Sequence, residues 1–180
     1  DEYIKNKEKA STLSIQKDEE TIKELSSQII KLGGKPNVDS KDLKELIKNL
    51  TRQLEQLNVS SVLKDKTKNI INDQKIKDIK VRFQKVIDLP PKDLRKLVDN
   101  GKKELGDGII IVFATNEDKV GLAVGITEKL VDKYDAVQFA KLGSETIGGK
   151  GGGGRKDFAQ AGGQDHSKID EAFEKIKSLI

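Results

Sequence analysis

Glycines and cations gather in one stretch of the chain, Gly148 to Asp165, which reads GGKGGGGRKDFAQAGGQD. Half of the sixteen glycines in the sequence fall between Gly148 and Gly163, and the only basic residues in that run are Lys150, Arg155 and Lys156. Glycine lets the backbone approach another molecule closely, and exposed amides flanked by cations can bind phosphates or bases. Flexible linkers draw on Ser and Pro instead. The stretch therefore predicts an ordered binding surface rather than a spacer.

The glycines do not form a standard nucleotide-binding motif. The spacing from Gly143 to Gly148 fits the start of a P-loop, but Gly149 stands where that motif requires lysine. A dinucleotide fingerprint is formally present at Gly149, Gly151 and Gly154. Any glycine run satisfies it, however, and this run follows a predicted helix rather than a strand. We therefore do not expect a nucleotide cofactor.

Residues suited to catalysis or metal binding are scarce. His166 is the only histidine, and the sequence has no cysteine. Zinc would lack soft ligands, and a serine nucleophile would have no base except His166, whose position at the start of the last predicted helix favours a cap or surface role. The sequence predicts neither a catalytic nor a metal site. The absence of cysteine fits a reducing compartment and favours a cytoplasmic location.

Charge gives a weaker indication of the partner. The formal net charge is +4 and the pI is near 9.0, a mild bias toward polyanions. Eight basic and three acidic residues lie between Lys64 and Lys85. This segment fits a nucleic-acid-facing patch and a solvated lysine-rich surface equally well. No apolar run approaches the ~18 residues that a membrane span requires, so we expect no membrane partner.

Two amphipathic helices are predicted in the N-terminal part, which we assign to residues 1–74 as a helical arm. The apolar residues of the first stripe are Ile15, Ile22, Leu25, Ile29 and Leu32. Those of the second stripe are Leu43, Ile47, Leu50, Leu54 and Leu57. The heptad-like spacing and the Gly33–Gly34 stop predict an antiparallel helical hairpin that self-associates. The alternative is a hairpin packed only on its own globular domain.

Residues 75–180 are predicted to form a globular domain. The weak apolar pattern of residues 58–71 suggests that the preceding helix continues, so the first strand is expected at 79–87. Further strands are expected at 108–114 and 120–126, and a short one at 157–161, with helices between them and at the end. The fold class is therefore α/β (α+β), a helical hairpin or coiled-coil arm followed by a small domain with a mixed sheet flanked by helices.

The run GGKGGGGRKDFAQAGG at 148–163 closely resembles the glycine-rich motif that ends the C-terminal domain of alanyl-tRNA synthetase. The resemblance extends upstream through IKVRFQKVIDLPPKDLRKLVDNGKKELGDGIIIVFA and DKVGLAVGIT, and it covers about Lys77 to the end. The arm is similar in kind to the oligomerising segment of that family. Departures are one extra glycine before Arg155, Lys156 in place of proline and Phe158 in place of methionine.

The resemblance implies a non-catalytic module of an ATP-dependent tRNA ligase. Such a module dimerises through its helices, binds the outer corner of tRNA(Ala), and helps aminoacylation and editing act on one tRNA. Phe158 could stack on a base, although its alternation with Ala159 and Ala161 favours a core position. The residues that the resemblance assigns to tRNA contact are Lys150, Gly151, Gly152, Gly153, Gly154, Arg155, Lys156, Gln160, Gly162 and Gly163.

The resemblance also implies which cofactors and domains of the parent enzyme are absent from this chain. The parent enzyme would use ATP, Mg²⁺ and an editing-domain Zn²⁺, but its adenylation motifs and editing zinc site are not in this sequence, so we expect no cofactor here. The chain begins with Asp1 rather than Met, and we expect it to be part of a longer protein that supplies the other synthetase domains. Two alternatives remain open. One is the RNA-binding C-terminal part of a DHH-type oligonucleotide phosphoesterase, and the other is a purely structural dimerisation module.

Overall fold

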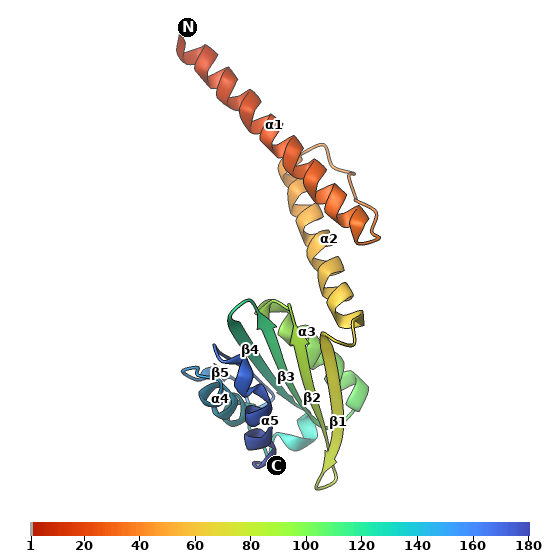
Figure 1. Cartoon of the computed structure of the whole chain (residues 1–180), viewed down its shortest axis with the longest axis vertical. Helices are drawn as coiled ribbons and strands as arrows, with labels where there is room; N and C mark the ends of the chain where they lie inside the picture. The colour runs from red at the N-terminus through yellow and green to blue at the C-terminus, as the bar shows by residue number, and fades with distance from the viewer. Residues whose placement is uncertain (1) are drawn as a thin grey trace. The chain divides into compact units, whose positions relative to one another are not determined.

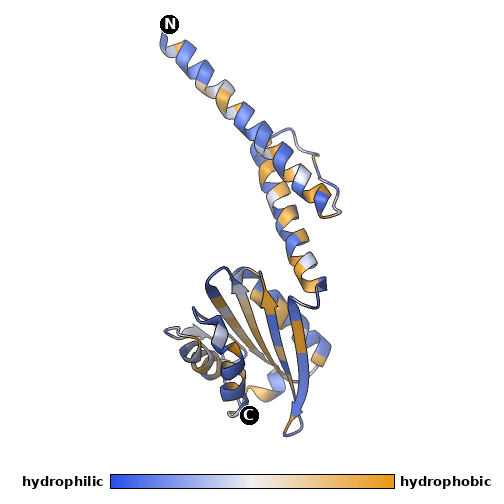
Figure 2. Cartoon of the chain, viewed as in Figure 1, coloured by the Kyte–Doolittle hydropathy of each residue, from blue (hydrophilic) through white to orange (hydrophobic). Residues whose placement is uncertain are grey.

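The computed structural model describes residues 2–180, which fold into two compact units that divide between Ser61 and Val62. The N-terminal unit holds helix α1, Glu2–Lys31, and most of helix α2, Leu43–Lys64 (Figure 1). Both helices are largely hydrophilic with scattered apolar positions (Figure 2). Their buried residues are Ile29, Leu46 and Leu50. The two predicted helices of the arm are confirmed.

Helix α1 ends at the predicted glycine pair. Gly33 has a φ of 81°, and its amide donates to the Ile30 carbonyl at 2.9 Å, while the Gly34 amide donates to the Ile29 carbonyl at 2.9 Å. These two bonds form a Schellman motif, in which a left-handed glycine satisfies the last carbonyls of a helix. Glycine is required at Gly33 because a residue with a Cβ is strained at that φ.

The connection between the two helices differs from the predicted antiparallel hairpin. Gly34 lies against Leu57, and the Gln53 side chain donates to the Lys35 carbonyl at 2.6 Å and accepts from the Asn37 amide at 3.2 Å. The connecting segment thus runs back along α2, and both helices run in the same direction (Figure 1). The eleven residues between Lys31 and Leu43 can reach about 36 Å when extended, enough to pass along the whole of the 22-residue α2, which is about 33 Å long. The apolar stripes define the helices but not this path.

A six-stranded mixed sheet forms the C-terminal unit, in the order β1-β2-β3-β4-β6-β5. The strands β2 and β3 are parallel, and every other neighbouring pair is antiparallel. The predicted mixed sheet is confirmed. The strands are β1 Asn69–Ile76, β2 Ile79–Ile87, β3 Ile109–Asn116, β4 Lys119–Ile126, β5 Gly152–Gly154 and β6 Phe158–Gly163.

The edge strand β1 is absent from the sequence prediction, which extended the helix through residue 71. Two of its isoleucines, Ile70 and Ile71, are adjacent in sequence, so the strand shows no alternation of apolar and polar residues. Both are also largely exposed, at 49% and 46%. The turn to β2 uses Lys77 and Asp78 with φ values of 49° and 68°. Two consecutive positive φ angles are typical of a type I′ hairpin turn, which usually contains Asn or Gly. The turn was missed because it has neither residue.

Helices cover both faces of the sheet. One face carries the 3₁₀ turn Pro91–Asp93 and α3, Leu94–Leu105, while the other carries α4, Ala136–Thr146, and α5, Ile169–Lys177 (Figure 1). Short 3₁₀ turns also occur at Glu128–Leu130 and His166–Lys168. The main core lies under α4 and α5, where Phe173 makes edge-to-face ring contacts with Phe83 and Phe113 at 4.9 and 4.8 Å.

Candidate nucleic-acid interface

The glycine-rich stretch forms one edge of the sheet. Strand β5 pairs only with β6, and its three glycines are all exposed. Lys150 and Gly151 lie in the link from α4, and Arg155 and Lys156 begin the turn into β6. The Cα partners are Gly152 with Ala161, Gly153 with Gln160, and Gly154 with Ala159. The predicted contact residues therefore lie together on two adjacent strands and their flanking loops.

Backbone hydrogen bonds indicate which amides of β5 face outward. Arg155 and Phe158 form a hydrogen-bonded pair, with N to O distances of 2.7 and 3.3 Å. Hydrogen-bonded and non-hydrogen-bonded pairs alternate along an antiparallel ladder. Gly152 and Gly154 therefore occupy non-hydrogen-bonded positions relative to β6, and their N–H and C=O groups point toward the open edge. This edge offers donors and acceptors with no side chain in front of them.

Two neighbouring glycines of β5 have different reasons for lacking a side chain. A Cβ added at Gly152 would lie 2.1 Å from the Gln160 carbonyl oxygen and 2.5 Å from the Ala161 Cβ, so the strand pairing itself requires glycine there. A Cβ at Gly153 would meet nothing within 4 Å. Packing within the chain therefore does not explain glycine at 153.

Strand alternation divides the residues of β6 between the two faces of the sheet. Ala159 is fully buried in the core, and Ala161 packs against the same core. Gln160 is exposed and points to the opposite face, the one that α3 partly covers. Its cross-strand partner Gly153 lies on that face as well. Gly163 instead packs against Ile147, so it lies on the α4 side, away from the open face.

Phe158 is half-buried and lies outside the main core. The predicted core position is wrong for this residue because alternation with Ala159 places it on the α3 face. There the guanidinium carbon of Arg95 lies 5.2 Å from the centre of the Phe158 ring, within the range of a cation–π contact. Arg95 therefore covers the ring at the border of the open face.

The cations of the stretch are exposed, while the turn that carries two of them is held in place. The Ala136 amide donates to the Lys156 carbonyl at 3.0 Å, and the Ile126 amide donates to the Asp157 carbonyl at 2.8 Å. The Arg155 Nε lies 3.4 Å from the Asp157 carboxylate, with 70% of the Arg155 side chain exposed. Exposed ion pairs contribute little free energy. Arg155 is therefore available to an external anion at small cost.

A buried hydroxyl positions the glycines, and sequence reasoning missed it. The Ser144 side chain is fully buried; it donates to the Gly162 carbonyl at 2.6 Å and accepts from the Gly151 amide at 3.1 Å. It thus ties the link before β5 to β6. A polar residue in the sequence of α4 is the only signal that could have pointed to this role.

Comparison with known proteins adds to this geometry. Residues 78–180 match the family model described as DHHA1 domain. The chain belongs to the DHHA1 domain family. Two curated relatives are alanine–tRNA ligases, from Parvibaculum lavamentivorans at 44% identity over 108 residues and from Rhodopseudomonas palustris at 48% over 103 residues. These matches cover 59% and 57% of this chain and 12% of each ligase.

A solved structure also resembles this chain. It is the C-Ala domain from Aquifex aeolicus alanyl-tRNA synthetase, with a TM-score of 0.57 and 25% sequence identity. The match covers 60% of this chain and 96% of that domain. The predicted similarity to the C-terminal domain of alanyl-tRNA synthetase is confirmed. Only about an eighth of each curated ligase is represented in the chain.

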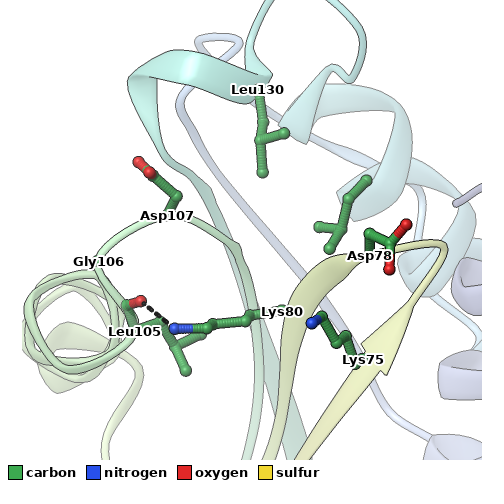
Figure 3. Close-up of a pocket in the computed structure, with 8 residues that line it drawn as sticks. Lys75, Asp78, Lys80, Leu105, Gly106, Asp107 and Leu130 are labelled. Carbon is green, nitrogen blue, oxygen red and sulfur yellow. Dashed lines mark hydrogen bonds between the residues drawn. The ribbon is translucent and has the colours of Figure 1, made fainter.

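The lysine-rich segment before the DHHA1 domain and at its start does not form one continuous cationic surface. Arg82 is only 7% exposed and pairs with Asp73 and Glu104. The hydrogen bonds that its guanidinium donates to the Asp73 carboxylate are the main cause of its raised pKa. Lys75 and Lys80 line a cavity of about 460 Å³ near the end of α3 (Figure 3). Lys80 donates to the Leu105 carbonyl at 3.4 Å, so part of this charge serves the fold.

His166 lies at the start of the last 3₁₀ turn and is exposed. The residue before it, Asp165, caps the turn by accepting from the Ser167 amide at 3.1 Å. A hydrogen bond from the Ser167 hydroxyl lowers the pKa of Asp165. Within residues 2–180, no three His, Cys, Asp or Glu side chains lie close enough to hold a metal ion, and no helix has the length and apolar character to cross a membrane.

Proposed function

We propose that the chain is the C-terminal tRNA-binding and dimerisation part of an alanine–tRNA ligase. In this proposal the chain binds the outer corner of tRNA(Ala) and helps aminoacylation and editing act on the same tRNA. The observation that carries the proposal is the exposed glycine edge at β5, with outward amides and flanking cations. The 44% and 48% identical ligases support the same assignment.

The surface has the properties that RNA recognition needs. Folded RNA is bound mostly through its shape, its phosphates and bases that are unstacked or at the end of a stack. A side-chain-free strand can lie against such a base, and exposed cations attract the phosphates. We propose tRNA contact by Lys150, Gly151, Gly152, Gly153, Gly154, Arg155, Lys156, Gln160 and Gly162. Gly163, the remaining residue that the resemblance assigns to contact, would instead support the surface by packing closely on Ile147.

The chemistry of charging and editing would belong to other domains of the parent ligase, in the cytoplasm. The parent would use ATP and Mg²⁺ for charging and Zn²⁺ in its editing domain, and this chain would hold none of them. We expect the isolated chain to bind tRNA without charging or deacylating it. Aminoacylation and deacylation assays on the chain alone test this expectation, and turnover in either would contradict it.

Self-association through the arm is supported by its uncovered apolar side chains. Ile4, Ile15 and Ile30, which share one side of α1, are 57%, 48% and 62% exposed. An amphipathic helix normally buries such residues against a partner. We propose that a second copy covers them. Sedimentation of the intact chain should give a dimer, and Ile15→Glu should give a monomer. Equal masses for the two would reject dimerisation through this stripe.

A salt-titrated binding assay tests RNA recognition. Full-length tRNA(Ala) should bind more tightly than its acceptor minihelix, because the minihelix lacks the outer corner. Arg155→Ala should weaken binding and make the slope of log K against log salt shallower by about 1. Lys119→Ala, at the exposed first residue of β4, is the control and should change neither quantity. Identical binding of both RNAs would reject corner recognition.

The two alternatives predict other outcomes in the same assay. A purely structural dimerisation module predicts that Arg155→Ala and Lys150→Ala leave RNA binding untouched. The C-terminal part of an oligonucleotide phosphoesterase predicts that short single-stranded oligonucleotides compete as well as tRNA. Loss of affinity in both variants, without such competition, supports the ligase assignment.

A further inference from the structure

Two cationic side chains of α3 contact residues next to the glycine-rich edge, although they lie far from it in sequence. Arg95 and Lys102 are two helical turns apart and therefore share one side of α3. Arg95 covers the Phe158 ring at 5.2 Å, and the Lys102 ammonium donates to the Asp157 carbonyl at 3.0 Å. Both thus meet the first residues of β6 and the turn before it.

The packing of α3 on the sheet fixes this orientation. The residues of α3 that are buried against the strands are Leu94, Leu97, Val98 and Gly101. Beneath them, a Cβ at Gly125 of β4 would lie 2.2 Å from Val98 and 2.9 Å from the Lys102 Cε. Because β4 carries no side chain there, Lys102 passes over the strand and reaches the turn. The neighbouring Lys96 and Lys103 point to the other side, away from the sheet, where both are exposed.

Lys102 also borders a cavity of about 640 Å³ beside the turn. Arg155 and Lys156 line the same cavity, together with the carboxylates of Glu128 and Asp157. The cations thus exceed the carboxylates by one. The Lys102 ammonium has three N–H donors, and its bond to Asp157 uses one of them. The cavity therefore offers unused donors and a surplus of positive charge next to the proposed RNA surface.

We propose that this flank of α3 is a second part of the RNA-binding surface. The cavity receives a backbone phosphate of the RNA, held by Lys102 and Lys156, while Arg95 contacts the neighbouring phosphate beside Phe158. Lysine and arginine bind phosphate oxygens through charge-assisted hydrogen bonds, and arginine can do so with two parallel bonds. The inference rests on the proposed function and adds residues outside the glycine-rich stretch to it.

Four single substitutions on α3 test the inference in the intact chain. Arg95→Ala and Lys102→Ala remove cations from the flank that faces β6, and Lys96→Ala and Lys103→Ala remove the same charge from the opposite side. The first pair should bind tRNA about three- to tenfold more weakly at fixed salt, with a salt slope shallower by about 1 for each. The second pair should retain the affinity and slope of the unchanged chain. Equal effects in all four, or no effect in the first pair, would overturn the inference.

A second measurement guards against an indirect effect, because Lys102→Ala also frees the Asp157 carbonyl. Lysines of the unchanged chain are acetylated with and without bound tRNA, and their modification is quantified. Bound tRNA should protect Lys102 while Lys103 stays reactive. Equal protection of the two lysines, or none, would contradict a phosphate site at Lys102.

The outcome for Arg155→Ala separates this inference from the proposed function. If Arg155→Ala weakens tRNA binding while Arg95→Ala and Lys102→Ala do not, the inference fails and the proposed function stands. If none of the three variants weakens binding, both fail.

Discussion

The two edges of the sheet are built from opposite kinds of residue. The eight residues of the β1 edge all carry side chains that extend beyond Cβ, among them the exposed Ile70 and Ile71. The β5 edge presents three glycines. An open strand invites pairing with other chains, and proteins guard such edges with charged side chains. The β1 edge carries Asp73 and Lys75 and is guarded, whereas β5 leaves its backbone bare. The difference fits the proposal that β5 is the edge that binds a partner.

The two edges are also held in different ways. At β1, the buried Arg82 binds the Asp73 carboxylate with N to O distances of 2.8 and 3.0 Å and also pairs with Glu104 of α3. At β5, the Ser144 hydroxyl positions the backbone of the glycines. Ion pairs of Arg82 thus hold the β1 edge, while the buried Ser144 hydroxyl holds the β5 edge from its α4 side. The outer edge of β5 therefore stays exposed.

The largest effect on stability is expected at the β1 edge. Arg82→Ala removes the shared partner of two carboxylates, and it should lower the free energy of unfolding by about 2–3 kcal/mol, since both partners keep contact with solvent. The tRNA affinity should not change. Urea unfolding and tRNA titration measure the two quantities. A large loss of affinity without loss of stability would mean that this edge, too, serves RNA.

The next effect is expected at Gly152, whose absent side chain the strand pairing requires. Gly152→Ala brings a Cβ to 2.1 Å from the Gln160 carbonyl oxygen, so β5 should detach from β6. Affinity for tRNA should fall by about tenfold or more, a loss that corresponds to about 1.4 kcal/mol. Faster amide exchange in residues 152–155 would show the detachment. Unchanged exchange and affinity would contradict the strand geometry.

Gly153 provides the matched test one residue away. Gly153→Val places a strand-compatible side chain where nothing lies within 4 Å, so stability should be retained. The side chain would stand on the open face beside Gln160, and tRNA binding should weaken by about three- to tenfold through loss of close approach. Thermal unfolding and tRNA titration separate the two effects. Full affinity in this variant would remove the functional reason for glycine at 153.

The smallest effect is expected from the exposed cap at Asp165. Its pKa is lowered from 3.8 in the folded state by the Ser167 hydrogen bond, so its contribution to stability is complete above about pH 4. That contribution is lost as pH falls through the lowered pKa. Asp165→Asn should therefore lower the unfolding temperature slightly at pH 7, and the difference should narrow as the pH falls below about 4. A constant difference would show that the carboxylate charge is not involved.

Local patterns were sufficient to predict much of the domain. The apolar run around Ile111 correctly predicted a buried strand, the alternation around Val81 correctly predicted a strand, and Pro91 marked the start of a helical segment. The pattern failed at β1, where exposed isoleucines and a Lys77–Asp78 turn give no strand or turn signal. The same limit explains the arm, since no local feature shows that its connection runs back along α2.

The candidate site was predictable only where its residues are adjacent in sequence. The glycine run marked the proposed surface, and in the structure three of its glycines form an edge strand. Arg95, Lys102 and Ser144 were missed because tertiary packing brings them to the motif, as in the bond from Lys102 to Asp157 across 55 residues. Phe158 was misplaced because alternation alone does not show which face of the sheet holds the main core.

Amide hydrogen exchange of the intact chain, with and without tRNA(Ala), tests the central claim most directly. Bound tRNA should slow exchange in peptides that span residues 150–156, while the amides of β1 should exchange as before. Slowed exchange at β1 or the arm with no change in residues 150–156, measured with tRNA saturating the chain, would contradict the assignment of the glycine edge as the RNA-binding surface.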